Sequence, residues 1–299
     1  MVNIKLIYLL KKLKKLKNVK LMNKETNKNQ RRILLMGGTS DSISILNMLK
    51  ESFPDVFVLT TTTTDHGARI AKTIEIGEVV SRSTSDKTLT DYIKEYSINL
   101  ILDASHPFAK NGRLSGIDAS KNTKIDYIRY ERPYLDINGL NLKHFENVFM
   151  VESFEEASII ISKNLPNNKV FHLGGVSTLN QTLKYLDPKD VLIRILPHNT
   201  SIQKATEMEI NPKNIIAIEG KFSKNFNKAL FKEYNINAII TKESGIAGGL
   251  KEKIEAADDL NIYIFLVKRP NIKELNGKLI INDLEDLKEL IKKVKMRKE

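Results

Sequence analysis

Asp103 and His106 are the residues of this chain whose types and placement are best suited to chemistry. They lie in the segment Asp103-Ala104-Ser105-His106-Pro107-Phe108-Ala109, which follows the largely apolar run 98–102. Such a run predicts a buried strand, and the loops at the carboxyl ends of parallel strands are where open α/β sheets bind their ligands. We therefore expect Asp103 and His106 to be catalytic. A loop histidine whose hydrogen bonds are satisfied locally is the alternative for His106.

A glycine turn ends an earlier predicted strand. Gly37-Gly38-Thr39-Ser40 follows the run 32–36 and precedes a segment with helical spacing of its apolar residues. Glycine lets the backbone approach a phosphate closely, and the start of a helix offers amide donors and a positive dipole end. The full G-x-G-x-x-G spacing is absent, so a plain turn with Ser40 or Asp41 as helix cap is the alternative.

The region about 20 residues beyond this turn would carry an acidic residue in a common NAD site. Here it reads Leu59 followed by five threonines, and Asp65 comes only after them. Hydroxyl groups in place of a carboxylate remove the repulsion against a 2′-phosphate, which favours NADPH over NADH. The alternative is a threonine-rich loop with no part in cofactor binding.

Several cations also stand at predicted strand ends. Arg129 and Arg132 flank the end of one strand, and Arg194 ends another in the second half of the chain. Lys242 and Ser244 follow a third strand in a turn that resembles an anion-binding corner, and Lys253, one helical turn into the next helix, could reach the same place. Arginines at such positions bind carboxylate or phosphate groups through paired hydrogen bonds. Ordinary surface ion pairing is the alternative for each of them.

Charge and composition restrict the classes of function. The chain of 299 residues has a net charge of +12, but residues 1–32 carry +10 of it, which leaves +2 for the rest. The basic tail, residues 1–31, is expected to be disordered or weakly helical; its leucine and lysine spacing also allows a helix that touches acidic lipid or RNA. We expect no nucleic-acid partner for the body of the protein.

The absence of cysteine excludes disulfides and thiolate metal sites. The five histidines show no close ligand spacing, so no protein-bound metal is expected. No run approaches the roughly 18 apolar residues of a membrane span, and the tail does not resemble a secretory signal. A cytoplasmic location is therefore expected, while the oligomeric state is not predicted.

Short β-branched runs alternate with helical segments from residue 32 onward, which predicts parallel sheets built from βαβ units. The expected fold is α/β, with two doubly wound Rossmann-like parallel-sheet domains and a cleft between them. The segment 134–147 interrupts the alternation and is interpreted as the link, giving domains at 32–140 and 141–299. Asp283 is expected to cap a final helix. The predicted strands lie at 33–36, 56–61, 76–80, 98–103 and 126–130, and then at 168–173, 190–195, 214–218, 236–241 and 261–267.

Taken in order, these segments resemble the precorrin-6A reductase family of the corrin (cobalamin) pathway. The resemblance covers about residues 32–270, and the His106 segment and the Arg129 segment are its most specific parts. Two positions depart from the family pattern: Lys221, where proline is usual, and the strand end 171–175. The matching segments are Gly37-Gly38-Thr39, Thr64-Asp65-His66-Gly67, Asp103–Ala109, Arg129-Tyr130-Glu131-Arg132-Pro133, Arg194-Ile195-Leu196-Pro197, Gly220-Lys221-Phe222, Lys242-Glu243-Ser244-Gly245 and Arg269-Pro270.

The resemblance implies an NADPH- or NADH-dependent enzyme that reduces a double bond of precorrin-6A, or of its cobalt form, to the corresponding precorrin-6B. The expected nucleotide site comprises Gly37, Gly38, Thr39 and Ser40 at the pyrophosphate, with Thr60 and Thr61 near the adenosine ribose. The residues expected to bind the tetrapyrrole substrate are Arg129, Arg132, Arg194, Lys242 and Ser244. His106 and the four cations among them are expected to face carboxylate arms of the substrate or a phosphate of the cofactor, and the proton comes from water or from His106. The alternatives are a non-catalytic dinucleotide sensor and a protein that acts through its lysine-rich tail.

Overall fold

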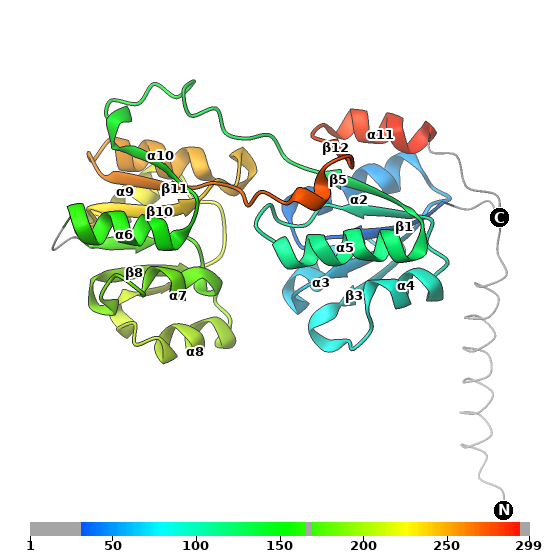
Figure 1. Cartoon of the computed structure of the whole chain (residues 1–299), viewed down its shortest axis with the longest axis horizontal. Coiled ribbons are helices and arrows are strands. Elements are labelled where there is room, and N and C mark those ends of the chain that lie inside the picture. The colour runs from blue at the N-terminus through cyan, green and yellow to red at the C-terminus, as the bar shows by residue number, and fades with distance from the viewer. Residues whose placement is uncertain (1–30, 166–168, 294–299) are drawn as a thin grey trace, which may run out of the picture. The chain divides into compact units, whose positions relative to one another are not determined.

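The computed structural model describes residues 31–165 and 169–293, so nearly all of the basic tail for which a helix was considered lies outside it. The described chain forms two compact units. Unit 1 contains the residues up to Glu131 and those from Ile272 onward, and unit 2 contains Arg132–Asn271. Each unit is built around its own parallel sheet (Figure 1).

Unit 1 has a six-stranded sheet with the spatial order β3-β2-β1-β4-β5-β12, in which every neighbouring pair is parallel. Its strands are β1 (Arg32–Met36), β2 (Phe57–Thr62), β3 (Glu78–Ser81), β4 (Leu100–Asp103), β5 (Asp126–Tyr130) and β12 (Leu279–Ile281). Its helices are α2 (Ser40–Ser52), α3 (Asp65–Lys72), α4 (Leu89–Glu95), α5 (Lys110–Thr123) and α11 (Leu284–Lys293).

The central strand β1 shows why this sheet is doubly wound. Side chains alternate between the two faces of a strand, and Ile33 and Leu35 lie in one apolar core while Leu34 and Met36 lie in another. The first core contains residues of α2 and α11, and the second contains residues of α4 and α5. Both faces of the sheet are therefore covered by helices, which is why its strands are apolar runs without alternation.

Unit 2 repeats this architecture with the spatial order β9-β8-β7-β10-β11-β6, and again every neighbouring pair is parallel. Its strands are β6 (Val148–Val151), β7 (Val170–His172), β8 (Val191–Ile195), β9 (Ile215–Ala217), β10 (Ala238–Lys242) and β11 (Tyr263–Val267). Its helices are α6 (Phe154–Asn164), α7 (Leu179–Thr182), α8 (Asn199–Glu207), α9 (Lys224–Glu233) and α10 (Leu250–Asp258).

Each sheet has a point at which the strand order reverses. In unit 1 the chain moves outward from β1 through β2 and β3, and then returns to place β4 on the other side of β1. In unit 2 the same reversal occurs between β7 and β10. Loops on either side of such a point diverge and leave a crevice at the carboxyl edge of the sheet, where ligands bind. The expectation of two doubly wound parallel-sheet domains is confirmed.

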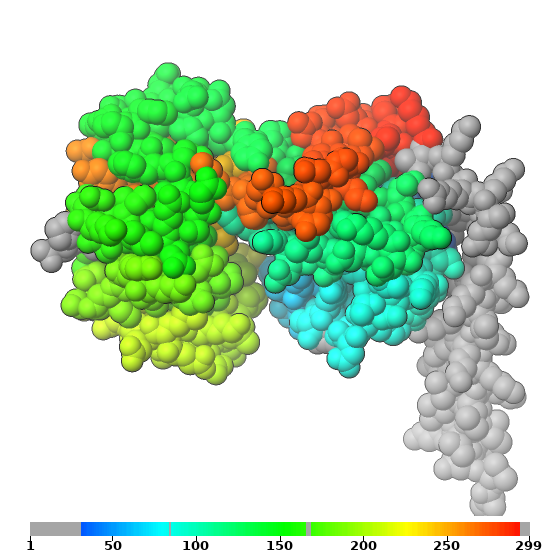
Figure 2. Space-filling model, in the orientation of Figure 1, coloured from blue at the N-terminus to red at the C-terminus, as the bar shows by residue number. Residues whose placement is uncertain are grey.

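The structure corrects the domain boundaries. The sequence prediction ended the first domain at residue 140 and assigned residues 141–299 to the second, but the last segment returns to unit 1. Strand β12 pairs in register with β5, Leu279 opposite Ile128, and α11 contributes Leu287 and Ile291 to the same core as α2 (Figure 1). Figure 2 shows the orange and red residues of this last segment lying against the rest of unit 1. The helix itself was predicted correctly: Asp283 caps it by accepting the amides of Glu285 and Asp286.

This return of the chain makes a stability prediction for Leu287, which is fully buried on α11. The substitution Leu287→Ala should lower the stability of unit 1 by about 2–5 kcal/mol, because it removes apolar contacts and leaves a cavity. Amide hydrogen exchange of β1 and α2 should become faster, while exchange of β7 and β10 should be unchanged. The exposed Leu279→Ala provides the matched control, and equal effects of the two variants would show that α11 does not complete this core.

Candidate active site

The loops after β1 and β4, on either side of the reversal point of unit 1, are hydrogen-bonded to each other. The hydroxyl of Thr39, in the turn after β1, donates to the carbonyl of Ala104, in the loop after β4, at 2.8 Å. The amide of Ala104 donates to the carbonyl of Met36 at 3.0 Å. The structure thus brings together the glycine turn and the His106 segment, as expected from their places at the carboxyl ends of neighbouring strands.

The glycine turn is closed on the side chain of Ser42. The amides of Gly38 and Thr39 both donate to the Ser42 hydroxyl at 3.1 Å, and the Thr39 hydroxyl in turn accepts the amide of Ser42. Gly38 has φ +94°, a conformation that disfavours other residues, and a Cβ on Gly37 would lie 3.1 Å from the Ser42 hydroxyl oxygen. The predicted cradle is therefore also a well-capped start of α2, whose first residue is Ser40.

The structure corrects the placement of Thr60 and Thr61 beside an adenosine ribose. Both are buried inside β2, and the Thr60 hydroxyl has no hydrogen-bond partner among the described residues. The strand runs on to Thr62, so the exposed residues at its carboxyl edge are Thr63 and Thr64. The misplacement arose because a run of identical residues does not show where the strand ends.

Asp103 is the centre of a buried polar network at the ends of β4 and β5. Its side chain is 0% exposed and accepts from the hydroxyl of Tyr127 at 2.5 Å, the amide of Ser105 at 2.8 Å and the guanidinium of Arg129 at 3.0 Å. The guanidinium of Arg113 lies 3.8 Å away. Burial and the neighbouring carboxylate raise the pKa of Tyr127, which therefore remains a hydrogen-bond donor.

Glu131 provides the second carboxylate of this network. It accepts from Arg129 Nε at 2.8 Å and lies 3.4 Å from Arg113, so two guanidinium groups face two carboxylates. Arg129 is 1% exposed, and although burial lowers its pKa, Asp103 and Glu131 outweigh this and raise it. The donors of Arg129 are directed at Asp103, Glu131 and the loop after β4, and its contact with the substrate stays a prediction.

The network holds the loop that carries His106. The guanidinium of Arg113 donates to the carbonyl of Pro107 at 3.1 Å, and Asp103 accepts the amide of Ser105 on the other side of the histidine. The imidazole is half-buried, and its Nδ1 accepts the amide of Phe108 at 3.2 Å. In the neutral ring the proton therefore resides on Nε2. Asp103 acts on this loop as a positioning residue, because its carboxylate does not reach the surface.

The predicted cations Lys242 and Arg194 lie in unit 2, at the carboxyl ends of β10 and β8. Lys242 donates to the carbonyl of Gly174 at 2.6 Å, in the loop after β7, and so spans the point at which the strand order reverses. Arg194 donates to the Asn227 side chain at 3.3 Å and lies over the ring of Phe222. Burial lowers the pKa of Lys242 to about 8 and that of Arg194 to about 10.

Arg132 and Ser244 are brought together, but in a role that the sequence prediction did not assign. The guanidinium of Arg132 donates to the carbonyl of Ser244 at 3.1 Å, and both residues are buried. Glu243, the residue before Ser244, accepts hydrogen bonds from the amides of Leu135 and Gly245, and its carboxylate pairs with Arg269. The contacts of Arg132 and Ser244 therefore fix the start of unit 2 against the loop after β10.

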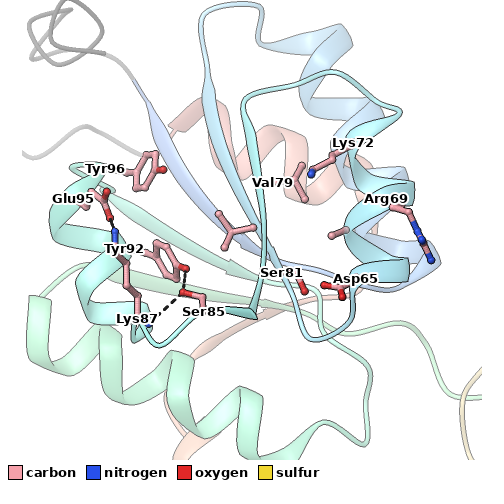
Figure 3. A pocket seen from close by; sticks show the side chains of 12 residues that line it. Asp65, Arg69, Lys72, Val79, Ser81, Ser85, Lys87, Tyr92, Glu95 and Tyr96 are labelled. Carbon is pink, nitrogen blue, oxygen red and sulfur yellow. Dashed lines mark hydrogen bonds and ion pairs between the residues drawn. The ribbon is translucent and has the colours of Figure 1, made fainter. Parts of the chain in front are cut away.

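A hollow of about 620 Å³ lies elsewhere in unit 1, between α3, β3 and α4 (Figure 3). Asp65, Arg69 and Lys72 of α3 line one side of it, and Tyr92 of α4 and Tyr96 directly after α4 line the other. Because β3 is the edge strand, the hollow lies away from the reversal point between β1 and β4. None of the residues predicted for catalysis or substrate binding lines it.

Sequence reasoning missed Ser42, Arg113 and Tyr127. Ser42 could have been found as the third helical residue after a capping threonine, whereas Arg113 and Tyr127 carry no local signal for their contacts with Asp103.

Within residues 31–165 and 169–293, no group of three or more histidine or acidic side chains is arranged to hold a metal. In the same part of the chain, no helix has the length and apolar character of a membrane span.

The chain was compared with known proteins. Residues 32–295 match the family model of precorrin-6x reductase CbiJ/CobK. The cobalt-precorrin-6A reductase of Methanothermobacter thermautotrophicus is 35% identical over 279 residues, which cover 93% of this chain and 89% of that protein. The one of Methanococcus maripaludis is 38% identical and covers 80% of this chain and 92% of that protein. The solved structure of CobK precorrin-6A reductase has a TM-score of 0.67 at 17% identity, covering 90% of this chain and 100% of that chain.

The buried network predicts a large effect of Asp103→Asn. This substitution leaves the Arg129 and Arg113 charges with one carboxylate instead of two, so we expect the stability to fall by about 3–5 kcal/mol. Urea unfolding measures this difference. The control Asp118→Asn changes an exposed aspartate of α5 and should alter stability by less than about 0.5 kcal/mol. Similar midpoints for the two variants would show that the network contributes no net stability.

Proposed function

Since this chain belongs to the precorrin-6x reductase family and is a reductase, we propose that it converts cobalt-precorrin-6A to cobalt-precorrin-6B by hydride transfer from NADH or NADPH. The observation that carries the choice of the cobalt form is the name shared by the relatives at 35% and 38% identity, which match over most of their length. The chemistry adds a hydride and a proton across one double bond of the macrocycle. The nicotinamide supplies the hydride, and the protein supplies orientation.

The nucleotide site in this proposal is the crevice between β1 and β4. The glycine turn fits a dinucleotide because it brings bare backbone to the carboxyl edge of the sheet: Gly38 has a positive φ, and Gly37 has little room for a side chain. Since Ser42 occupies the amides of Gly38 and Thr39, the pyrophosphate is assigned to the Ser40 end of the turn and the positive end of the α2 dipole. The contact with the adenosine ribose is assigned to Thr63 and Thr64 in place of Thr60 and Thr61.

The ring substrate is assigned in part to the carboxyl edge of the sheet in unit 2. Its carboxylate arms need cations, and Lys242 and Arg194 lie at that edge, where they donate to the Gly174 carbonyl and to the Asn227 side chain. The macrocycle itself needs apolar surface, and the loops after β10 and β8 expose Ile246 (63%) and Leu196 (42%). Cations beside exposed apolar side chains suit a flat polyanion better than they suit a sugar or a nucleic-acid base.

His106 is assigned to the protonation step or to an arm of the substrate. Its loop lies next to the glycine turn, and its Nδ1 is occupied by the amide of Phe108, which leaves Nε2 as the atom that donates. Asp103 and Arg113 hold the loop but do not contact the reactants in this assignment. Water is the other source of the proton, and a variant of His106 distinguishes the two.

The enzyme assay tests the proposed function. Purified protein mixed with cobalt-precorrin-6A and NADH or NADPH should oxidise the nucleotide and produce a ring two hydrogens heavier, as followed by nicotinamide absorbance and mass spectrometry. Parallel reactions with metal-free precorrin-6A should be slower if the cobalt form is the substrate. Tight nucleotide binding without any turnover or ring binding would instead support a non-catalytic dinucleotide sensor.

A second prediction concerns His106→Gln. If His106 donates the proton, kcat should fall by at least about 100-fold. If His106 binds a substrate arm, KM for the ring should rise. In both cases KM for the nucleotide should stay close to its original value. The control His144→Gln changes a histidine of unit 2 that lies outside the proposed sites and should leave both constants unchanged. Unchanged kcat and KM in His106→Gln would assign the proton to water and remove His106 from the site.

A further inference from the structure

Tyr134 is an exposed aromatic residue that the assignments above leave unexplained. It lies shortly after β5, at the start of unit 2, and its side chain is 65% exposed. Among the large hydrophobic side chains of the described residues, only Ile246, at 63%, is exposed to a similar degree. Single exposed apolar side chains are common on protein surfaces, but two of them on adjoining segments are a candidate binding surface.

The segments that carry these two residues are in direct contact. Gly245, directly before Ile246, has φ +67°. A Cβ on it would lie 2.7 Å from the carbonyl oxygen of Pro133, directly before Tyr134, so a side chain here would force the two segments apart. Tyr134 is therefore held beside the loop after β10, one of the two loops at the reversal point of the unit 2 sheet, where ligands bind in folds of this kind.

The Tyr134 ring is oriented by Arg269, which lies just after β11. The guanidinium carbon of Arg269 is 4.0 Å from the centroid of the ring, in a cation–π contact. Arg269 is itself fixed, because it is 9% exposed and pairs with the carboxylate of Glu243. It also donates to the carbonyls of Arg132 at 2.7 Å and Pro133 at 3.1 Å. The exposed ring thus rests on a buried support, which reduces the entropy lost when a ligand stacks on it.

An oriented aromatic ring beside an exposed isoleucine suits a flat, conjugated ligand. Aromatic side chains bind such groups by offset stacking, and an aliphatic side chain adds apolar contact area. The nicotinamide and adenine rings of the nucleotide are flat groups of this kind, but the nucleotide is assigned to the glycine turn of unit 1. The macrocycle is therefore the flat ligand that remains for unit 2.

We propose that Tyr134 contacts the substrate directly and that the conjugated face of the macrocycle stacks on its ring, with Ile246 extending the apolar surface. The inference rests on the proposed function, which supplies a conjugated macrocycle as the ligand. Arg269 acts as a positioning residue, because it holds both the Tyr134 ring and the backbone before it. This surface recognises the body of the ring and not its carboxylate arms, so its contribution to affinity should not depend on salt.

The test is Tyr134→Leu, which keeps an apolar side chain and removes the aromatic ring. We expect the Kd of cobalt-precorrin-6A, measured by calorimetric titration without nucleotide, to rise about 3- to 10-fold at both low and high salt, because the stacking contact is lost. Tyr134→Phe retains the ring and should bind like the wild type. The matched control is Tyr185→Leu, which should leave Kd unchanged: Tyr185 is 46% exposed and lies between α7 and β8, at the amino end of the strands of unit 2.

A single tryptophan provides a readout that a purely structural role would not change. The chain contains no tryptophan, so Tyr134→Trp places the only indole at the proposed contact. The rate at which acrylamide quenches its emission by collision, obtained from fluorescence lifetimes, should fall when cobalt-precorrin-6A binds. The rate should stay unchanged when NADH or NADPH is added alone. In the control Tyr185→Trp, the quenching rate should not respond to the ring substrate.

Each outcome decides the proposal. Equal ring affinity in the wild type and Tyr134→Leu would overturn it, and so would equal losses in Tyr134→Leu and Tyr134→Phe, which would assign the effect to the hydroxyl. A loss of affinity confined to the nucleotide would also overturn it, because it would place a nicotinamide or adenine ring on Tyr134. If the wild type binds the ring but does not reduce it, the proposed function fails, and weaker binding by Tyr134→Leu still supports the stacking contact. A wild type that binds no ring would overturn both proposals.

Discussion

The carboxylate of Asp103 is the interaction on which the arrangement of unit 1 depends. It lies at the end of β4 with no exposure to solvent, and a charge there is tolerated only because Arg129, Tyr127 and the Ser105 amide all donate to it. Those donors come from β5 and from the loop after β4. The carboxylate thus connects the ends of β4 and β5 with the His106 loop, and the Thr39 hydroxyl joins the glycine turn to the same loop.

The buried cations at the carboxyl edges of the two sheets have different hydrogen-bond partners. At the edge of unit 1, guanidinium groups face carboxylates, and the network is internally neutral. At the edge of unit 2, Arg194 donates to the Asn227 side chain, Lys242 and Lys253 donate to backbone carbonyls, and burial lowers the pKa values of all three. The cations of unit 1 support the loop that carries His106, because Arg113 donates to the carbonyl of Pro107 in that loop.

The connectivity of the chain imposes a further constraint. Because β12 and α11 complete the sheet and core of unit 1, the whole of unit 2 is inserted between two parts of unit 1. The two connections at 131–132 and 271–272 therefore link the units twice. Arg269 fixes the first of these crossings by donating to the carbonyls of Arg132 and Pro133, so the entry and exit of unit 2 are held together within that unit.

The sequence by itself determined the fold class, most strand positions, the final helix and the loops that carry the candidate site residues. These depend on local information: apolar runs, helical spacing, and the residue types that follow a strand. Tertiary structure alone decided that residues 272–293 belong to unit 1, that Thr60 and Thr61 are inside β2, and that Arg129 faces two carboxylates. The physical reason is that a charge acquires its role from its partners, and these partners are brought to it by strands and helices far away in the chain.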